Sequence, residues 1–154
     1  MGERSRRRLL VLAALASLAI ALVFAAPVDA ATGGGTVAQV SQTTTTFVLN
    51  GKEVVIKGTA VDQFSGTLNG TANMRFTAGT DQSGLTHVVV IGDCTCTVQG
   101  QTGTVHLVLV LRDMTAIGGA VQGGLYAQGT SGDLASFRGV FRVTNFGYTG
   151  FYSL

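Results

Sequence analysis

Cys94 and Cys96 are the only cysteines of the chain, and their spacing is the first feature that could carry chemistry. With one residue between them on a β-strand, both thiols would point to the same face, about 6–7 Å apart. In an unstrained disulfide the two cysteines lie closer together than this, so a bond would need the strand to bulge or turn. We rank a local disulfide first, because no other cysteine is present as a partner, two packed thiols second, and a zinc or copper site third.

The two histidines, His87 and His106, are the next candidates, because an imidazole can bind a metal or act as a general base. Each lies inside an apolar, alternating run, which favours a packed histidine or one that lines a pore. The sequence holds no Gly-x-Ser-x-Gly elbow, no histidine pair at i, i+4 and no obvious carboxylate pair. The catalytic residues are therefore unknown, we lean against an enzyme, and we expect neither a metal site nor a cofactor.

Two arginines complete the set of candidate side chains. Arg138 precedes Gly139, where its guanidinium could bind a carboxylate or backbone carbonyls, although a structural role in a turn is the favoured alternative. Arg112 follows an apolar run and could point toward a cavity. The candidate ligand-binding residues are therefore His87, His106, Arg112 and Arg138.

The elements that must position these residues follow an export signal over residues 1–30. Four arginines at positions 4–8 form a cationic head, residues 9–26 form an uncharged apolar run, and residues 27–30 end in small side chains. The apolar run falls short of the about 20 residues of a membrane-spanning helix, so we expect cleavage and no stable membrane span. The protein is then secreted or held in the cell envelope, through the Sec route or, from the pattern at residues 5–10, the twin-arginine route.

Removal of the signal makes the remaining chain electrically neutral. Beyond residue 30 the chain has equal numbers of basic and acidic residues, six of each. The basic residues are Lys52, Lys57, Arg75, Arg112, Arg138 and Arg142, and the acidic residues are Glu53, Asp62, Asp81, Asp93, Asp113 and Asp133. A nucleic-acid-binding surface needs clustered lysine and arginine. We therefore expect no nucleic-acid partner.

The mature chain is expected to hold one all-β domain over residues 47–154, preceded by a flexible Gly/Thr-rich leader over residues 31–46. The leader contains too little apolar surface to offset its ordering entropy. Beyond it, short runs rich in Val, Thr, Leu and Phe alternate with turn signals, which is typical of a sandwich or barrel. Asn50-Gly51, Asn69-Gly70 and a turn over residues 100–103 predict hairpins among eight to ten strands.

The run 104–112 shows the side-chain alternation most clearly. Val105, Leu107, Leu109 and Leu111 share one face, and the other face carries Thr104, His106, Val108, Val110 and Arg112. Both faces are mostly apolar. Such a strand belongs in a sandwich interior, or in a barrel whose outer wall packs on a partner, so a homo-oligomer is expected.

The second half of the chain resembles a known family. Gly100-Gln101-Thr102-Gly103-Thr104-Val105 resembles a Gly-x-x-Gly-Ser/Thr strand opening, and residues 131–139 (SGDLASFRG) resemble a Thr-Gly-Glu-Leu-Ala-Gly-Leu-Arg-Gly motif. Gly118–Gly124 and Gly147–Tyr152 follow in the same order. These residues are similar to a family of uncharacterised bacterial secreted proteins placed with the allene oxide cyclase and dirigent-like β-barrels. The resemblance implies a small antiparallel barrel, preceded by a signal helix, with an apolar cavity, and it transfers no catalytic residue.

Three functions follow from this pattern, in order of preference. The first is an exported module that binds a small apolar ligand in the barrel. The second is a cyclase-type or dirigent-type enzyme that steers a reactive intermediate, which requires His87, His106 or Arg112 to point into the cavity. The third is a structural or oligomeric protein of the cell envelope, which requires a filled interior and a large apolar outer wall.

Overall fold

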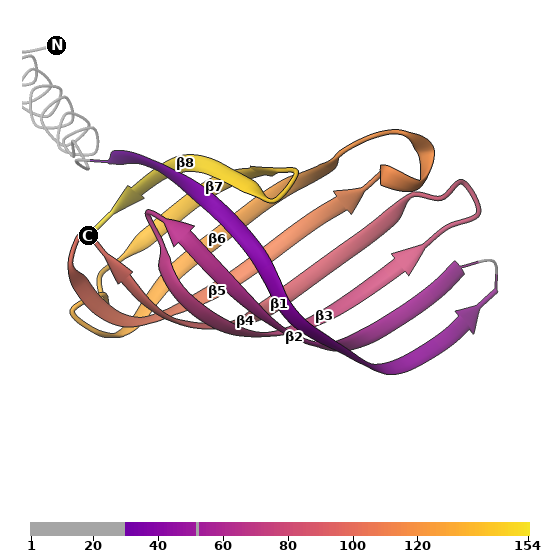
Figure 1. Cartoon of the computed structure of the whole chain (residues 1–154), viewed down its shortest axis with the longest axis horizontal. Helices are drawn as coiled ribbons and strands as arrows, with labels where there is room; N and C mark the ends of the chain where they lie inside the picture. Colours follow the sequence, from indigo (N-terminus) through magenta and orange to yellow (C-terminus); the bar gives the residue numbers. More distant parts are fainter. Residues whose placement is uncertain (1–29, 52) are drawn as a thin grey trace, which may run out of the picture.

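The computed structural model describes residues 30–51 and 53–154, so the signal peptide expected over residues 1–30 lies, except for Ala30, outside the described residues. The described part forms one sheet of eight antiparallel strands that closes in a ring (Figure 1). Each strand pairs with its neighbours in the sequence, and the first also pairs with the last. The strands are β1 (Ala31–Asn50), β2 (Glu53–Gly66), β3 (Asn69–Thr80), β4 (Thr86–Val98), β5 (Gln101–Asp113), β6 (Val121–Gly132), β7 (Arg138–Thr144) and β8 (Gly147–Ser153).

The turns agree with the predicted hairpins in one case and differ by a few residues in two. The β1–β2 turn lies at Gly51, whose φ of 62° fits the predicted Asn-Gly turn. The β2–β3 turn lies before Asn69, which already pairs with Thr97 of β4, so the second Asn-Gly pair starts a strand. The β4–β5 turn lies at Gln99 and Gly100, both with positive φ, one step earlier than predicted.

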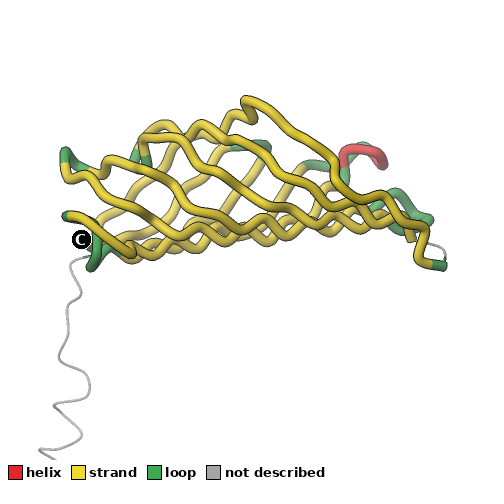
Figure 2. The backbone as a smooth tube through the Cα atoms, turned by 90° about the horizontal axis from the view of Figure 1, so that it is seen from below, coloured by secondary structure: helices red, strands yellow, loops and turns green. Residues whose placement is uncertain are grey.

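The two ends of the ring differ because its strands differ in length. At one end, which we call the packed end, the β2–β3 and β6–β7 turns fold inward and bury Leu68, Leu134 and Phe137 completely. At the other end, which we call the open end, β7 and β8 are only seven residues long, and β1 continues past its last pair with β8 to Asn50. Figure 2 shows the long strands continuing toward this end, where the only helical segment among the described residues, η1 (Thr115–Ile117), follows β5. The ring is therefore closed at the packed end and open on one side at the other.

β1 corrects the expectation of a flexible leader over residues 31–46. Residues 31–36 pair with β8 and close the ring, and the strand continues along β2 to Asn50. The glycines that suggested flexibility are needed for packing, because a Cβ on Gly35 would meet the Tyr148 ring and one on Gly33 would meet the Tyr152 ring. All pairs that close the ring therefore lie within residues 31–153.

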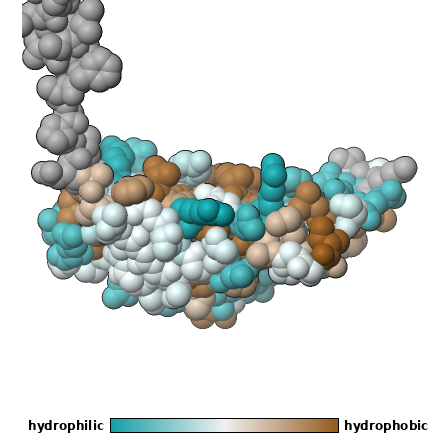
Figure 3. Space-filling model, turned by 90° about the horizontal axis from the view of Figure 1, so that it is seen from above, coloured by the Kyte–Doolittle hydropathy of each residue, from teal (hydrophilic) through white to brown (hydrophobic). Residues whose placement is uncertain are grey.

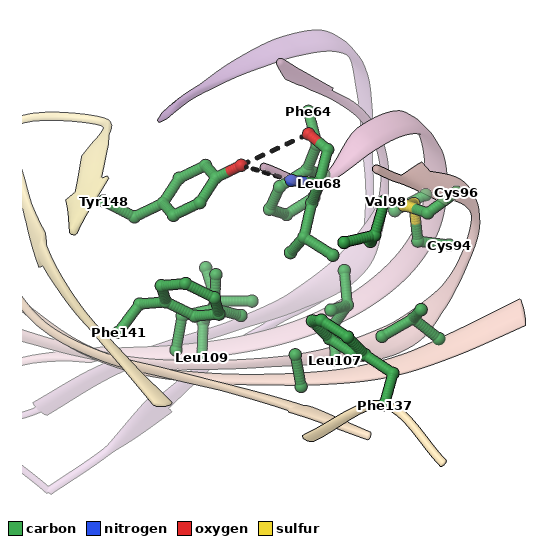
Figure 4. Packing of buried hydrophobic residues seen from close by; sticks show 14 of the residues in the cluster. Phe64, Leu68, Cys94, Cys96, Val98, Leu107, Leu109, Phe137, Phe141 and Tyr148 are labelled. Carbon is green, nitrogen blue, oxygen red and sulfur yellow. Dashed lines mark hydrogen bonds between the residues drawn. A yellow bond between two sulfur atoms is a disulfide. The ribbon is translucent and has the colours of Figure 1, made fainter. Parts of the chain in front are cut away.

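The core lies inside the packed half of the ring (Figure 4). Its largest fully buried side chains are Phe64, Leu68, Met74, Leu107, Leu125, Leu134, Phe137, Phe141 and Tyr148. The predicted alternation along β5 is confirmed, and the structure turns the face with the fully buried Val105 and Leu107 inward. Phe141 packs edge-on against Tyr148 with ring centroids 5.3 Å apart, a favourable aromatic geometry.

The hydroxyl of Tyr148 ties β8 to the β2–β3 turn across the interior. It accepts a hydrogen bond from the Leu68 N–H at 3.0 Å and can donate to the Leu68 carbonyl oxygen at 3.2 Å (Figure 4). The carbonyl oxygen of Ser65 also lies 3.2 Å from it. Burial raises the pKa of this phenol, which keeps its donor proton in place. Tyr148 therefore acts as an internal tie at the packed end.

The outer wall carries a row of exposed or half-buried apolar side chains across adjacent strands. Each member is the direct cross-strand partner of the next, so their side chains are neighbours on one surface; the row is Ile91, Val108, Tyr126, Val140 and Phe151. Figure 3 shows hydrophobic and hydrophilic residues mixed on one face of the molecule. No helix of the described part is long and apolar enough to cross a membrane.

Candidate ligand-binding cavity

A cavity of about 340 Å³ occupies the open half of the ring. Its volume lies near the lower limit of ordinary small-molecule sites, about 300–1,000 Å³. Seven strands supply its walls, and most of the lining is apolar: Val37, Ala60, Phe76, Ala78, Val88, Val90, Leu109, Leu111, Val121, Val143 and Phe146. The core fills the packed half of the same interior, so the space is confined to the open end.

Strand alternation explains why this end stays empty. The inward positions of β3 change from Met74 and Phe76, which reach into the interior, to Ala78, whose methyl group fills little space. On β2, Gly58 faces inward, and a Cβ there would meet the Phe76 ring. The ring of Phe76 therefore lies over the Gly58 backbone and forms one wall of the cavity.

β1 and the β7–β8 turn form the rim. The Val37 N–H donates to the Phe146 carbonyl at 2.8 Å, the last backbone hydrogen bond between β1 and the β7–β8 hairpin. Beyond it, β1 continues with β2 as its only partner, and register shifts lie between Gln39 and Ser41 and between Thr44 and Thr46. Bulges of this kind interrupt the row of unpaired backbone groups that an edge strand presents.

Five polar residues line the cavity: Gln39, Gln42, Asp62, Thr86 and Asp113. Asp113 accepts hydrogen bonds from the Thr115 N–H at 2.9 Å and the Thr115 hydroxyl at 2.6 Å, and these lower the pKa of its carboxyl. Asp62 differs, because burial alone shifts its carboxyl and raises its pKa. Asp62 is thus the less stabilised of the two carboxylates.

The four ligand-binding residues predicted from the sequence do not line this cavity. His87, His106 and Arg112 occupy outward positions of β4 and β5, and Arg138 is exposed at the start of β7. His106 Nδ1 lies 2.8 Å from a carboxylate oxygen of Asp93, which also faces outward. The expectation is corrected because the inward face is the other one, with Leu107 and Leu111.

Arg138 has the structural role that was its favoured alternative. Its guanidinium donates to the carbonyl oxygens of Phe137 at 2.7 Å and Ala135 at 3.3 Å. Asp133 and Leu134 precede these residues in the β6–β7 turn. The nine-residue motif over residues 131–139 therefore builds the turn that closes the packed end.

Cys94 and Cys96 are joined by a disulfide, with Cα atoms 5.3 Å apart. This separation is shorter than the about 6–7 Å expected for these positions on an extended strand, and it brings the two sulfur atoms within bonding reach. Both cysteines are buried in the core and do not line the cavity. Within residues 30–51 and 53–154, no group of three or more His, Cys, Asp or Glu side chains could hold a metal ion.

Sequence reasoning missed Asp62 as a cavity residue, although a signal for it exists. Asp62 lies two residues after Ala60 and two before Phe64, so the alternation along β2 places all three on the inward face. A second hollow of about 390 Å³, lined mainly by polar residues such as Ser41, Thr43 and Asn73, lies along β1 to β3. It brings together no pair of titratable groups.

Comparison of the chain with protein-family models, with curated proteins and with solved structures found no match.

Proposed function

We propose that this chain is an exported binding module that holds a small apolar ligand in the cavity at the open end of the ring. The observation that carries the proposal is the uneven interior, with a core that fills one half and an apolar cavity in the other. Packed interiors rarely leave spaces of this size, and apolar cavities attract apolar molecules. The signal sequence supports a location outside the cytoplasm.

The proposed fold relationship is to the allene oxide cyclase and dirigent-like barrels. The motifs in the second half of the chain support it, and so does a ring of antiparallel strands around an apolar cavity. We do not propose the enzymatic alternative. It required His87, His106 or Arg112 to point into the cavity, and all three occupy outward positions.

Filling the cavity tests the binding function. Ala78→Phe is expected to weaken binding of an uncharged apolar probe such as N-phenyl-1-naphthylamine or a long-chain alcohol by more than about tenfold, because the new ring occupies space that the ligand needs. Binding would be measured by fluorescence and calorimetry on the chain that starts at Ala31. Within a series of alcohols, affinity should rise roughly fourfold with each added methylene until the cavity is full.

The matched control is Thr77→Phe, the same change one residue earlier on β3. Thr77 is exposed and faces away from the cavity, so this variant is expected to bind like the wild type. Equal loss in both variants would point to damaged folding. Unchanged affinity in Ala78→Phe, or no binding of any alcohol by the wild type, would contradict the proposal.

A structural or oligomeric role is a second candidate: the apolar row on the outer wall supports it, whereas the filled interior that it also required is present only in the packed half. Tyr126, Val140 and Phe151 are each more than half exposed, and they are consecutive cross-strand partners. If copies associate through this row, the chain will scatter light as an oligomer. Val140→Lys, between Tyr126 and Phe151 in the row, will then release monomers, because it places a charge where two copies would exclude water. A monomeric wild type would rule this role out.

A further inference from the structure

Charge is distributed unevenly between the two faces of the sheet. Both ionisable side chains that line the cavity are carboxylates, Asp62 on β2 and Asp113 at the end of β5. None of the described basic residues lines the cavity: Lys57, Arg75, His87, His106, Arg112, Arg138 and Arg142. A neutral chain thus encloses a negatively charged cavity, which attracts cations and repels anions.

The two carboxylates differ in what they can still bind. Asp113 is held by the N–H and hydroxyl of Thr115, so part of its capacity for accepting hydrogen bonds is already used. The carboxylate of Asp62 makes no ion pair with the described residues, and its half-buried position beside Ala60 and Val37 removes part of its hydration. A partly desolvated carboxylate in an apolar wall gains most from a cationic partner.

We propose that the cavity takes a cationic amphiphile, a molecule with an apolar body and a protonated amine, whose ammonium group lies against Asp62. The apolar walls receive the body, and Gln39, which is the cross-strand partner of Asp62, adds an amide beside the charged group. This inference rests on the proposed function, since it specifies the ligand class for the same cavity. A fatty-acid carboxylate of the same length would meet two like charges there.

The test compares three ligands that share one alkyl chain: decylamine, decanol and decanoate. Titration calorimetry on the chain from Ala31 at neutral pH should give at least about tenfold tighter binding of decylamine than of decanol, with decanoate weakest, as expected for a charge-assisted hydrogen bond in a partly buried site. In Asp62→Asn this preference should disappear while the affinity for decanol is kept. The matched control, Asp93→Asn, removes an outward-facing carboxylate and should keep the wild-type preference.

Acidity provides an independent measurement. Because burial raises the pKa of Asp62, the preference for decylamine should fall as the pH is lowered through that raised pKa, while decanol binding stays constant. The ionised carboxylate of Asp62 favours binding of the amine but disfavours folding, because a raised pKa in the folded state means that ionisation costs stability. Asp62→Asn should therefore melt at a higher temperature than the wild type at neutral pH, and this gain should vanish below the pKa of an unfolded aspartate.

The outcomes separate this inference from the function on which it rests. Equal binding of decylamine and decanol, or tighter binding of decanoate, would overturn the cationic ligand class and leave the apolar binding module standing. A preference that persists in Asp62→Asn would overturn the role of that residue. Failure of all three ligands to bind would overturn both proposals.

Discussion

A chain that begins at Val37 instead of Ala31 is expected to lose roughly 3–5 kcal/mol of folding stability, since each lost hydrogen bond contributes about 1 kcal/mol and aromatic surface is exposed as well. Residues 31–36 are the whole paired length between β1 and β8. Gly34 also accepts a hydrogen bond from the Thr67 N–H and donates one to the Thr67 hydroxyl, both at 2.9 Å. Without this segment, the ring cannot close.

The loss would be measured as the free energy of unfolding in urea, with the chain from Ala31 as the reference. A chain that begins at Ala30 is the control and should be as stable as the reference, because the first ladder pair joins Ala31 to Tyr152. If the chain from Val37 unfolded with the stability of the reference, residues 31–36 would be a leader in the sense first expected from the sequence, and the closed ring would be wrong.

This segment shows why composition alone failed to predict β1. Three successive glycines and few apolar side chains normally indicate a flexible segment, since glycine weakens a strand by about 0.5–1 kcal/mol relative to alanine. Here Tyr148 and Tyr152 pack against Gly35 and Gly33, where any side chain would collide with their rings. The stabilising partner lies more than a hundred residues away in the sequence, so no local pattern reveals it.

The faces of the strands were predictable, but not which face lines the cavity. The alternation along β5 separated Leu107 from His106 and Val108 correctly, and the structure buries the leucine. Both faces are apolar, so the sequence did not distinguish the interior from the outer wall. The two histidines were consequently predicted as cavity residues, although they lie on the outer face. Asp62 was not predicted, although it lies two residues before the buried Phe64 and therefore on the same face of β2.

Tyr148→Phe is expected to destabilise the ring by about 1–3 kcal/mol, the cost of leaving buried polar groups without partners. The tyrosine is 1% exposed, and its hydroxyl accepts a hydrogen bond from the Leu68 N–H while it faces the carbonyl oxygens of Ser65 and Leu68. Phenylalanine keeps the ring packed against Phe141 and removes only the oxygen. The expected loss therefore measures the tie between β8 and the β2–β3 turn.

Tyr126→Phe is the matched control, because the same atom is removed from a tyrosine that is 52% exposed on the outer wall. Its stability should change by less than about 0.5 kcal/mol, as is usual for surface substitutions. Denaturant unfolding of both variants gives the difference directly. Ligand binding should be affected less than folding by Tyr148→Phe. The reason is that no cavity-lining residue forms a hydrogen bond with the hydroxyl that is lost. Equal stability of the two variants would mean that solvent or a neighbouring group satisfies the Leu68 N–H, and Tyr148 would then contribute only the packing of its ring.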